Sequence, residues 1–91
     1  MELSWTPSAL RDLDDAGNYI AKDNPSAAAL IGQRVQEAVE YLETHPALGR
    51  TGRLRSTREL VVSGTPLIII YRVQLDLIQV LRVLHHARKW P

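Results

Sequence analysis

The chain has 91 residues, no cysteine, and 45% hydrophobic and 23% charged residues. This length predicts a single domain, residues 1–91, with one modest core and no room for separate cofactor and substrate domains. The lack of cysteine excludes disulfides and thiolate metal sites, and no stretch is long and apolar enough to span a membrane. A zinc site built from histidines and carboxylates stays open, but no pair of the three histidines has useful spacing. We expect a cytoplasmic protein that uses no metal, cofactor or small-molecule substrate.

The formal net charge of +1 hides an uneven distribution. Residues 1–45 carry eight acids and three bases, a net charge of −5, whereas residues 46–91 carry eight bases and two acids, a net charge of +6. Two interpretations are open. The basic half contacts a polyanionic partner, or two acidic helices simply lie beside a basic sheet.

The first half predicts a short strand and two helices. After the extended run Leu3–Trp5, Thr6 can cap a helix that has Pro7 at its first position, and Asn24 and Pro25 repeat this arrangement. The apolar residues of the first helix recur at helical spacing: Leu10, Leu13, Gly17 and Ile20. Those of the second are Ala28, Ile31, Val35, Ala38, Val39 and Leu42, and Pro46 prevents its continuation. The short turn between them predicts an antiparallel hairpin.

The second half predicts a loop and three strands. Residues 46–56 form a loop with two glycines and three arginines, and its length favours a functional reason. Strands are expected at Thr57–Val62, Leu67–Val73 and Leu77–His85, the middle one apolar enough to be buried on both faces. The order β-α-α-β-β-β predicts an α+β fold, with an N-terminal antiparallel helical hairpin packed on a small, mainly antiparallel sheet.

The densest group of cations lies in and after this loop. Arg50, Arg53, Arg55 and Arg58 could contact phosphates or an acidic protein surface, or could be solvated or paired with acids of the second helix. Glu59 follows Arg58 on a strand, where neighbouring side chains point to opposite faces. Glu59 could serve as a general base, but pairing with a nearby arginine is the favoured interpretation.

One set of charged and titratable residues could be catalytic. His85 at the end of the last strand could act as acid or base, with cations from Arg72 and Arg82 and a base from Glu59. Such a set would suffice for ribonucleolytic transesterification. Hydrogen bonding of His85 to backbone is the simpler interpretation. No enzymatic motif of high specificity is present.

Six fragments in order carry a family resemblance. They are Trp5-x-x-x-Ala9-x-x-Asp12-Leu13, Tyr19-Ile20-Ala21-x-Asp23-Asn24-Pro25-x-Ala27-Ala28, Pro46-x-x-Gly49-Arg50, Thr57-Arg58-Glu59-Leu60-Val61, Pro66 with Ile70-Tyr71-Arg72-Val73, and Val83-Leu84-His85-x-Ala87-x-x-Trp90-Pro91. Together they resemble the ParE branch of the RelE/ParE toxin superfamily. The resemblance implies a bacterial type II toxin with the fold described above, bound and neutralised by a cognate antitoxin, ParD-like or other, in a hetero-oligomer.

The resemblance also bears on activity. ParE-type toxins poison DNA gyrase and catalyse nothing themselves, whereas RelE-type relatives cut mRNA on the ribosome. Leu67, Ile68 and Ile69 stand where ribonuclease members commonly carry an arginine. The C-terminal residues resemble those of gyrase poisons. Departures at Leu67 and His86 leave a third possibility, a degenerate toxin that serves only as an antitoxin-binding module. The resemblance therefore favours a gyrase inhibitor that is not an enzyme.

The expected site residues follow from these interpretations. For the gyrase contact they are Arg50, Arg53, Arg55, Arg58, His85, Arg88 and Trp90. For the antitoxin contact, in a groove between the helices and the sheet, they are Leu13, Ile20, Ile31, Val35, Arg58 and Arg72. If the protein is a ribonuclease instead, the catalytic set is His85, Arg82, Arg58 and Glu59.

Overall fold

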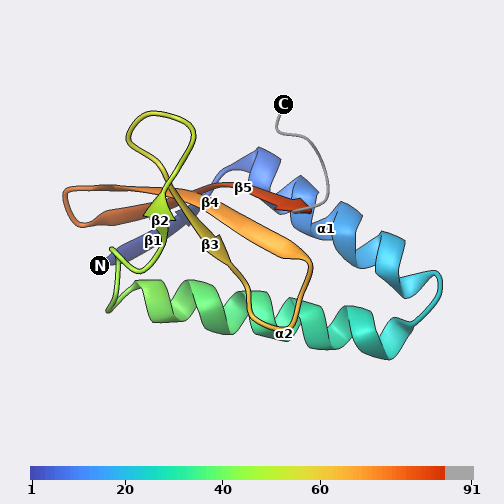
Figure 1. The fold of residues 1–91 in the computed structure, drawn as a ribbon. Coiled ribbons are helices and arrows are strands. Elements are labelled where there is room, and N and C mark those ends of the chain that lie inside the picture. The colour runs from blue at the N-terminus through green and yellow to red at the C-terminus, as the bar shows by residue number, and fades with distance from the viewer. Residues whose placement is uncertain (86–91) are drawn as a thin grey trace.

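A computed structural model describes residues 1–85 as two helices packed on one side of a five-stranded sheet (Figure 1). The elements in chain order are β1 Glu2–Trp5, α1 Pro7–Ala21, α2 Pro25–Leu42, β2 Arg50–Thr51, β3 Arg58–Val61, β4 Leu67–Gln74 and β5 Leu77–His85. The strand order is β1-β5-β4-β3-β2, in which β1 runs parallel to β5 and every other pair is antiparallel. The predicted α+β class, helical hairpin and mainly antiparallel sheet are confirmed.

The two helices begin where their caps predict. The Thr6 hydroxyl accepts a hydrogen bond from the Ala9 N–H at 3.0 Å, and the Asn24 side chain accepts one from the Ala27 N–H at 3.0 Å. Each cap satisfies a backbone donor that the first helical turn leaves unpaired. Within the residues that the structure describes, neither helix is long and apolar enough to cross a membrane.

The helices differ in how well the sequence predicted their buried faces. On α2, Val35, Val39 and Leu42 are fully buried, as expected from the apolar stripe. On α1, Leu13, Gly17 and Ile20 of the predicted stripe are partly buried, but Leu10 is 51% exposed and Ala9 is fully buried instead. The core-facing side of α1 contains alanines, which bury little area and give a weak periodic signal.

The sheet has two unlike faces. We call the face that meets the helices the helix face, and its core residues include Leu67, Ile69, Tyr71, Ile78, Val80 and Val83. The other face, which neither helix covers in Figure 1, is called the open face. Because directly paired residues project to the same side, Arg58 belongs with Tyr71 to the helix face, whereas Glu59 belongs with Ile70 to the open face. The sequence had left this choice undecided.

One strand was missed. Arg50 and Thr51 form β2, which pairs antiparallel with β3, inside the segment predicted to be a loop. Two residues are too few for a periodic pattern, and only the pairing with Glu59 and Arg58 defines them as a strand. The five residues Leu67, Ile68, Ile69, Ile70 and Tyr71 are all buried, which confirms that this part of β4 is buried on both faces, although neither helix covers the open face.

Candidate functional site

The cationic segment forms an ordered hairpin, which we call the arginine hairpin and define as residues 50–58. Its loop is closed by a hydrogen bond from the Gly52 N–H to the Thr57 carbonyl at 2.8 Å, and the Thr57 hydroxyl donates to the Leu54 carbonyl at 2.6 Å. A Cβ at position 52 would collide with the Thr57 hydroxyl oxygen, so this close approach requires glycine. The loop is therefore a compact turn whose backbone is held by its own hydrogen bonds.

Glu59 supports this hairpin from the open face. The side chain is almost fully buried, and its carboxylate accepts the Arg53 backbone N–H at 2.9 Å and the Arg50 guanidinium at 3.3 Å. A buried carboxylate needs such partners to offset its lost hydration. The prediction that Glu59 pairs with a nearby arginine is confirmed, and its oxygens are engaged in holding the loop.

Tyr71 and Arg58 fix the connection between α2 and β2. The fully buried Tyr71 hydroxyl donates to the Pro46 carbonyl at 2.8 Å and accepts from the Gly49 N–H at 2.8 Å. Arg58 donates to the Gly49 carbonyl at 2.8 Å and to the Ala47 carbonyl at 3.4 Å. The Arg58 guanidinium thus anchors backbone on the helix face.

The buried hydroxyl of Tyr71 makes stability depend on alkaline pH. Burial raises the pKa of Tyr71 above its ordinary value of 10.0, although the hydrogen bond from Gly49 and the charge of Arg58 act in the opposite direction. A raised pKa means that the folded state holds the proton more tightly. This contribution is fully present below pH 10 and is lost as the pH rises through the raised pKa.

We therefore expect the free energy of unfolding to fall more steeply above about pH 10 in the wild type than in Tyr71→Phe. Urea titrations between about pH 8 and about pH 11 would measure both slopes. Tyr19→Phe is the matched control, because Tyr19 is 71% exposed. Equal slopes for the wild type and Tyr71→Phe would contradict the prediction.

A second cluster joins α1 to β5, and we call Asp12, Arg82 and Val83 the α1–β5 clamp. The Asp12 carboxylate accepts two hydrogen bonds from the Arg82 guanidinium, at 2.6 and 3.0 Å, and one from the Val83 N–H at 3.0 Å. The hydrogen bond to Asp12 raises the pKa of Arg82 above its ordinary value. The Arg82 guanidinium therefore keeps its positive charge throughout the physiological range.

The clamp occupies a particular place in the sheet. Strand β1 pairs with β5 only as far as Val80, which leaves the next part of β5 without a neighbouring strand on that side. There the Thr6 hydroxyl donates to the Leu81 carbonyl at 2.8 Å, and Asp12 takes the Val83 N–H. Residues of α1 and its cap thus replace a missing strand and cover the exposed edge.

Beside the clamp lies a cavity of about 380 Å³ between α1 and the end of β5. Of the residues that the structure describes, its walls comprise Asp12, Asp15, Ala16, Tyr19, Ile20, Leu67, Arg82, Val83, Leu84 and His85. The lining combines aliphatic side chains with one ion pair, one further carboxylate and one histidine. Such a mixture suits a peptide side chain better than a phosphate.

The four groups of the predicted ribonuclease set do not converge. Arg58 lies on the helix face and Glu59 on the open face, each bound to its own backbone partners. Glu59 pairs with Ile70 on β4, and Ile70 pairs with Arg82 on β5. The Cα atoms of Glu59 and Arg82 are therefore two strand spacings apart, about 10 Å. His85 lines the cavity, three residues beyond Arg82, and Arg82 is bound to Asp12.

The residues expected to bind an antitoxin are also dispersed. Val35 is fully buried in the core, so its assignment to a partner surface is wrong. Leu13 and Ile31 pack partly against the core, and Ile20 lines the cavity. Arg72 lies on β4 and donates to Gln79 at 2.8 Å. Periodicity marks an apolar face, but it cannot separate residues buried by the sheet from residues left for a partner.

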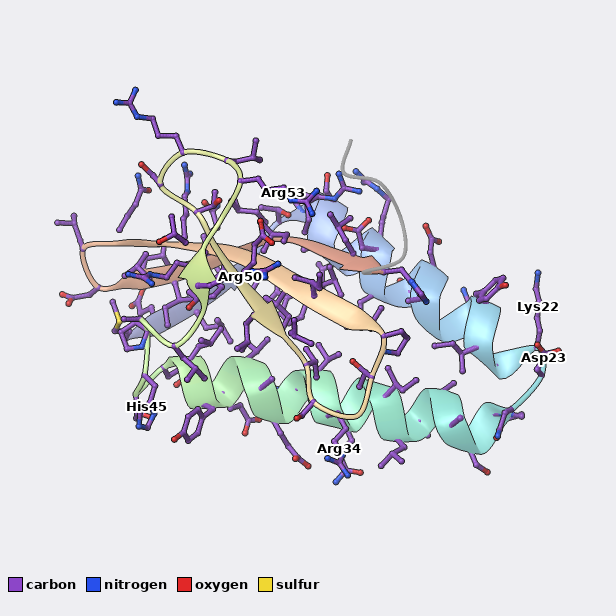
Figure 2. All side chains as sticks on the ribbon, viewed as in Figure 1. Lys22, Asp23, Arg34, His45, Arg50 and Arg53 are labelled. Carbon is purple, nitrogen blue, oxygen red and sulfur yellow. The ribbon has the colours of Figure 1, made fainter. Side chains whose placement is uncertain are left out.

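The described residues among the expected target contacts lie in three places. Arg50, Arg53 and Arg55 lie together in the arginine hairpin, and Figure 2 shows Arg50 and Arg53 beside the open face. Arg58 turns to the helix face, and His85 lies at the opposite end of β4, where it pairs with Leu67. Arg88 and Trp90 fall outside the residues that the structure describes.

Two residues with central positions were not assigned a role from sequence. Asp12 and Tyr71 appeared only as members of family fragments. Asp12 reaches a partner 70 positions away, and Tyr71 reaches partners 25 and 22 positions away. Their presence in the ordered fragments was the one signal in the sequence that could have drawn attention to them.

Comparison with known proteins places this fold in a class. A solved structure titled chromosomal ParDE TA system from P. aeruginosa matches with a TM-score of 0.85 and 28% identity, covering 93% of this chain and 95% of that one. The putative toxin Y4kP of Sinorhizobium fredii is 48% identical over 89 residues, 98% of this chain and 92% of the relative. Toxin RelE2 of Caulobacter vibrioides is 36% identical over 87 residues, 96% and 97% of the two chains.

The fold and these relatives define a toxin of the RelE/ParE superfamily. Residues 3–90 match the model of the ParE toxin of the type II toxin–antitoxin system parDE, and the chain belongs to this family.

Proposed function

We propose that the chain is a type II toxin that inhibits DNA gyrase by binding, without catalysis of its own, and that an antitoxin neutralises it. The observation that carries the absence of catalysis is the separation of Arg58 and Glu59, both from each other and from the cavity that Arg82 and His85 line. A ribonuclease needs a base, an acid and a cation around one phosphate. Hydrogen bonds to other groups of this chain hold Arg58, Glu59 and Arg82 apart.

The arginine hairpin supports a binding function. Its loop is braced by Gly52, Thr57 and Glu59, so little conformational entropy is lost when a partner docks on it. Arg55 is exposed at this loop, and the Arg50 side chain is 66% exposed despite its ion pair. A cationic element of this kind suits a partner that is itself a protein–DNA complex.

An antitoxin partner is proposed from the family and from the cavity. The P. aeruginosa relative belongs to a system named ParDE, a toxin–antitoxin pair. In this chain the cavity beside the α1–β5 clamp offers aliphatic walls from Ala16, Ile20 and Leu67 for an antitoxin side chain. Arginines elsewhere on the surface would steer an acidic antitoxin segment and raise its association rate.

Supercoiling by purified gyrase tests the proposal. We expect added toxin to slow supercoiling and to accumulate linear DNA, and Arg55→Glu to weaken both effects. Arg34→Glu is the matched control, because Arg34 is exposed on α2, away from the arginine hairpin (Figure 2). Unchanged supercoiling without linear DNA, together with mRNA cleavage at the ribosomal A site in expressing cells, would overturn the proposal in favour of a ribonuclease. Normal growth on expression of the toxin alone would favour a degenerate toxin.

A further inference from the structure

Three exposed leucines lie in connecting segments on one side of the molecule, and we call this surface the turn end. It comprises Leu48 in the α2–β2 connection, Leu54 in the arginine hairpin and Leu75 in the β4–β5 turn, which are 50%, 54% and 97% exposed. The strand register places the loop with Leu54 and the turn with Leu75 at the same end of the sheet, because Arg58 at the start of β3 pairs with Tyr71 near the end of β4. In Figure 1 the hairpin loop and the β4–β5 turn lie on the same side of the molecule.

Leu75 is unusual in its backbone as well as its exposure. It is the first central residue of the two-residue turn that joins Gln74 to Leu77, and its φ is +52°. Glycine is the ordinary residue at a first central position with positive φ, because a Cβ makes the left-handed region unfavourable. A leucine here neither relieves the backbone nor buries its side chain within the chain. Strain of this kind at an exposed apolar residue points to a contact outside the molecule.

Leu54 is held in position and has charge beside it. Its carbonyl accepts the Thr57 hydroxyl and the Thr57 N–H, so the turn that carries Leu54 is fixed. Arg55 follows it and is exposed, and the Arg50 guanidinium lies in the same hairpin. The turn end therefore presents apolar side chains beside positive charge, which complements an apolar notch with carboxylates at its rim.

We propose that the turn end is the surface by which the toxin docks on its protein target, with Leu54 and Leu75 as apolar anchors and Arg55 pairing with carboxylates of that target. This inference rests on the proposed function. Phosphates would use Arg55 but would gain nothing from the leucines, so the apolar anchors favour a protein surface over DNA. The cavity assigned to the antitoxin lies at the other end of β4, near Leu67, which leaves the turn end available to a different partner.

The test uses Leu75→Gly, Leu54→Ala and the two changes combined. Glycine at position 75 is expected to keep or raise the melting temperature, because it removes a side chain and relieves the positive φ. We expect each single variant to need about tenfold more toxin for half-inhibition of gyrase supercoiling, and the double variant about a hundredfold more. Growth arrest after expression without antitoxin should weaken in the same order. Leu30→Ala, at a 51% exposed leucine of α2, is the matched control and should change neither measurement.

Each outcome decides between explanations. Full potency of the double variant against gyrase would overturn the docking surface and leave the proposed function standing. Loss of potency with Arg55→Ala alone, and not with the leucine variants, would indicate phosphate contact and would also overturn it. Weaker antitoxin binding with unchanged potency would assign the turn end to the antitoxin instead. If the wild type arrests growth without affecting gyrase, and the leucine variants weaken that arrest, gyrase is overturned as the target but the docking surface is supported. A wild type that affects neither growth nor gyrase would overturn both.

Discussion

Replacing Asp12 by alanine is expected to lower the free energy of unfolding by about 3 kcal/mol, because one carboxylate satisfies three donors that join α1 to β5. The Asp12 side chain is only 16% exposed, so water cannot fully replace it. Its removal leaves the Val83 N–H unpaired at the sheet edge and the Arg82 guanidinium without its counter-ion. Urea denaturation followed by far-ultraviolet circular dichroism would measure the loss.

Two further variants separate the parts of this effect. Asp12→Asn keeps an acceptor for the Val83 N–H but loses the charge opposite Arg82, so we expect an intermediate loss of about 1 to 2 kcal/mol. Asp15→Ala changes an exposed carboxylate one turn along on the same helix and should cost less than about 0.5 kcal/mol. If Asp12→Ala and Asp15→Ala were equally stable, the clamp would contribute nothing to folding.

Replacing Tyr71 by phenylalanine is the second change with a large expected effect, a loss of about 2 to 3 kcal/mol. The ring of Tyr71 would still fill the core, but the Pro46 carbonyl and the Gly49 N–H would both lose their partner. The site cannot easily admit water in compensation, because Tyr71 is fully buried. Thermal and urea unfolding would measure this loss.

Tyr41→Phe provides the control, since Tyr41 is 51% exposed on α2 and its ring stacks on His45, a contact that phenylalanine keeps. We expect it to change stability by less than about 0.5 kcal/mol. The α2–β2 connection leads directly into the arginine hairpin, so Tyr71→Phe should also weaken the proposed inhibition of gyrase at temperatures where the variant is still folded. A Tyr71→Phe variant as stable as Tyr41→Phe would show that the hydroxyl does not hold the connection.

The sequence predicted those features that depend on neighbouring residues. Thr6 with Pro7 and Asn24 with Pro25 start helices through contacts three residues away, and the apolar run of β4 needs only its own length and composition to indicate burial. The six ordered fragments pointed to the family, which the comparisons confirm. Pairing of Glu59 with an arginine was also foreseen, because one residue of the Arg58–Glu59 pair had to find a partner near the sheet.

Only the tertiary structure decided where the functional groups meet. Periodicity cannot tell whether Arg58 or Glu59 faces the helices, since one position of register exchanges the two faces of a strand. The partner of Asp12 lies 70 residues away, and nothing local in α1 distinguishes Asp12 from Asp15. Nor does the sequence show that Leu75 is exposed on a left-handed backbone, whereas Leu67 is buried. Local chemistry sets the elements of this chain, but contacts between residues far apart in it set the surfaces that the elements leave for partners.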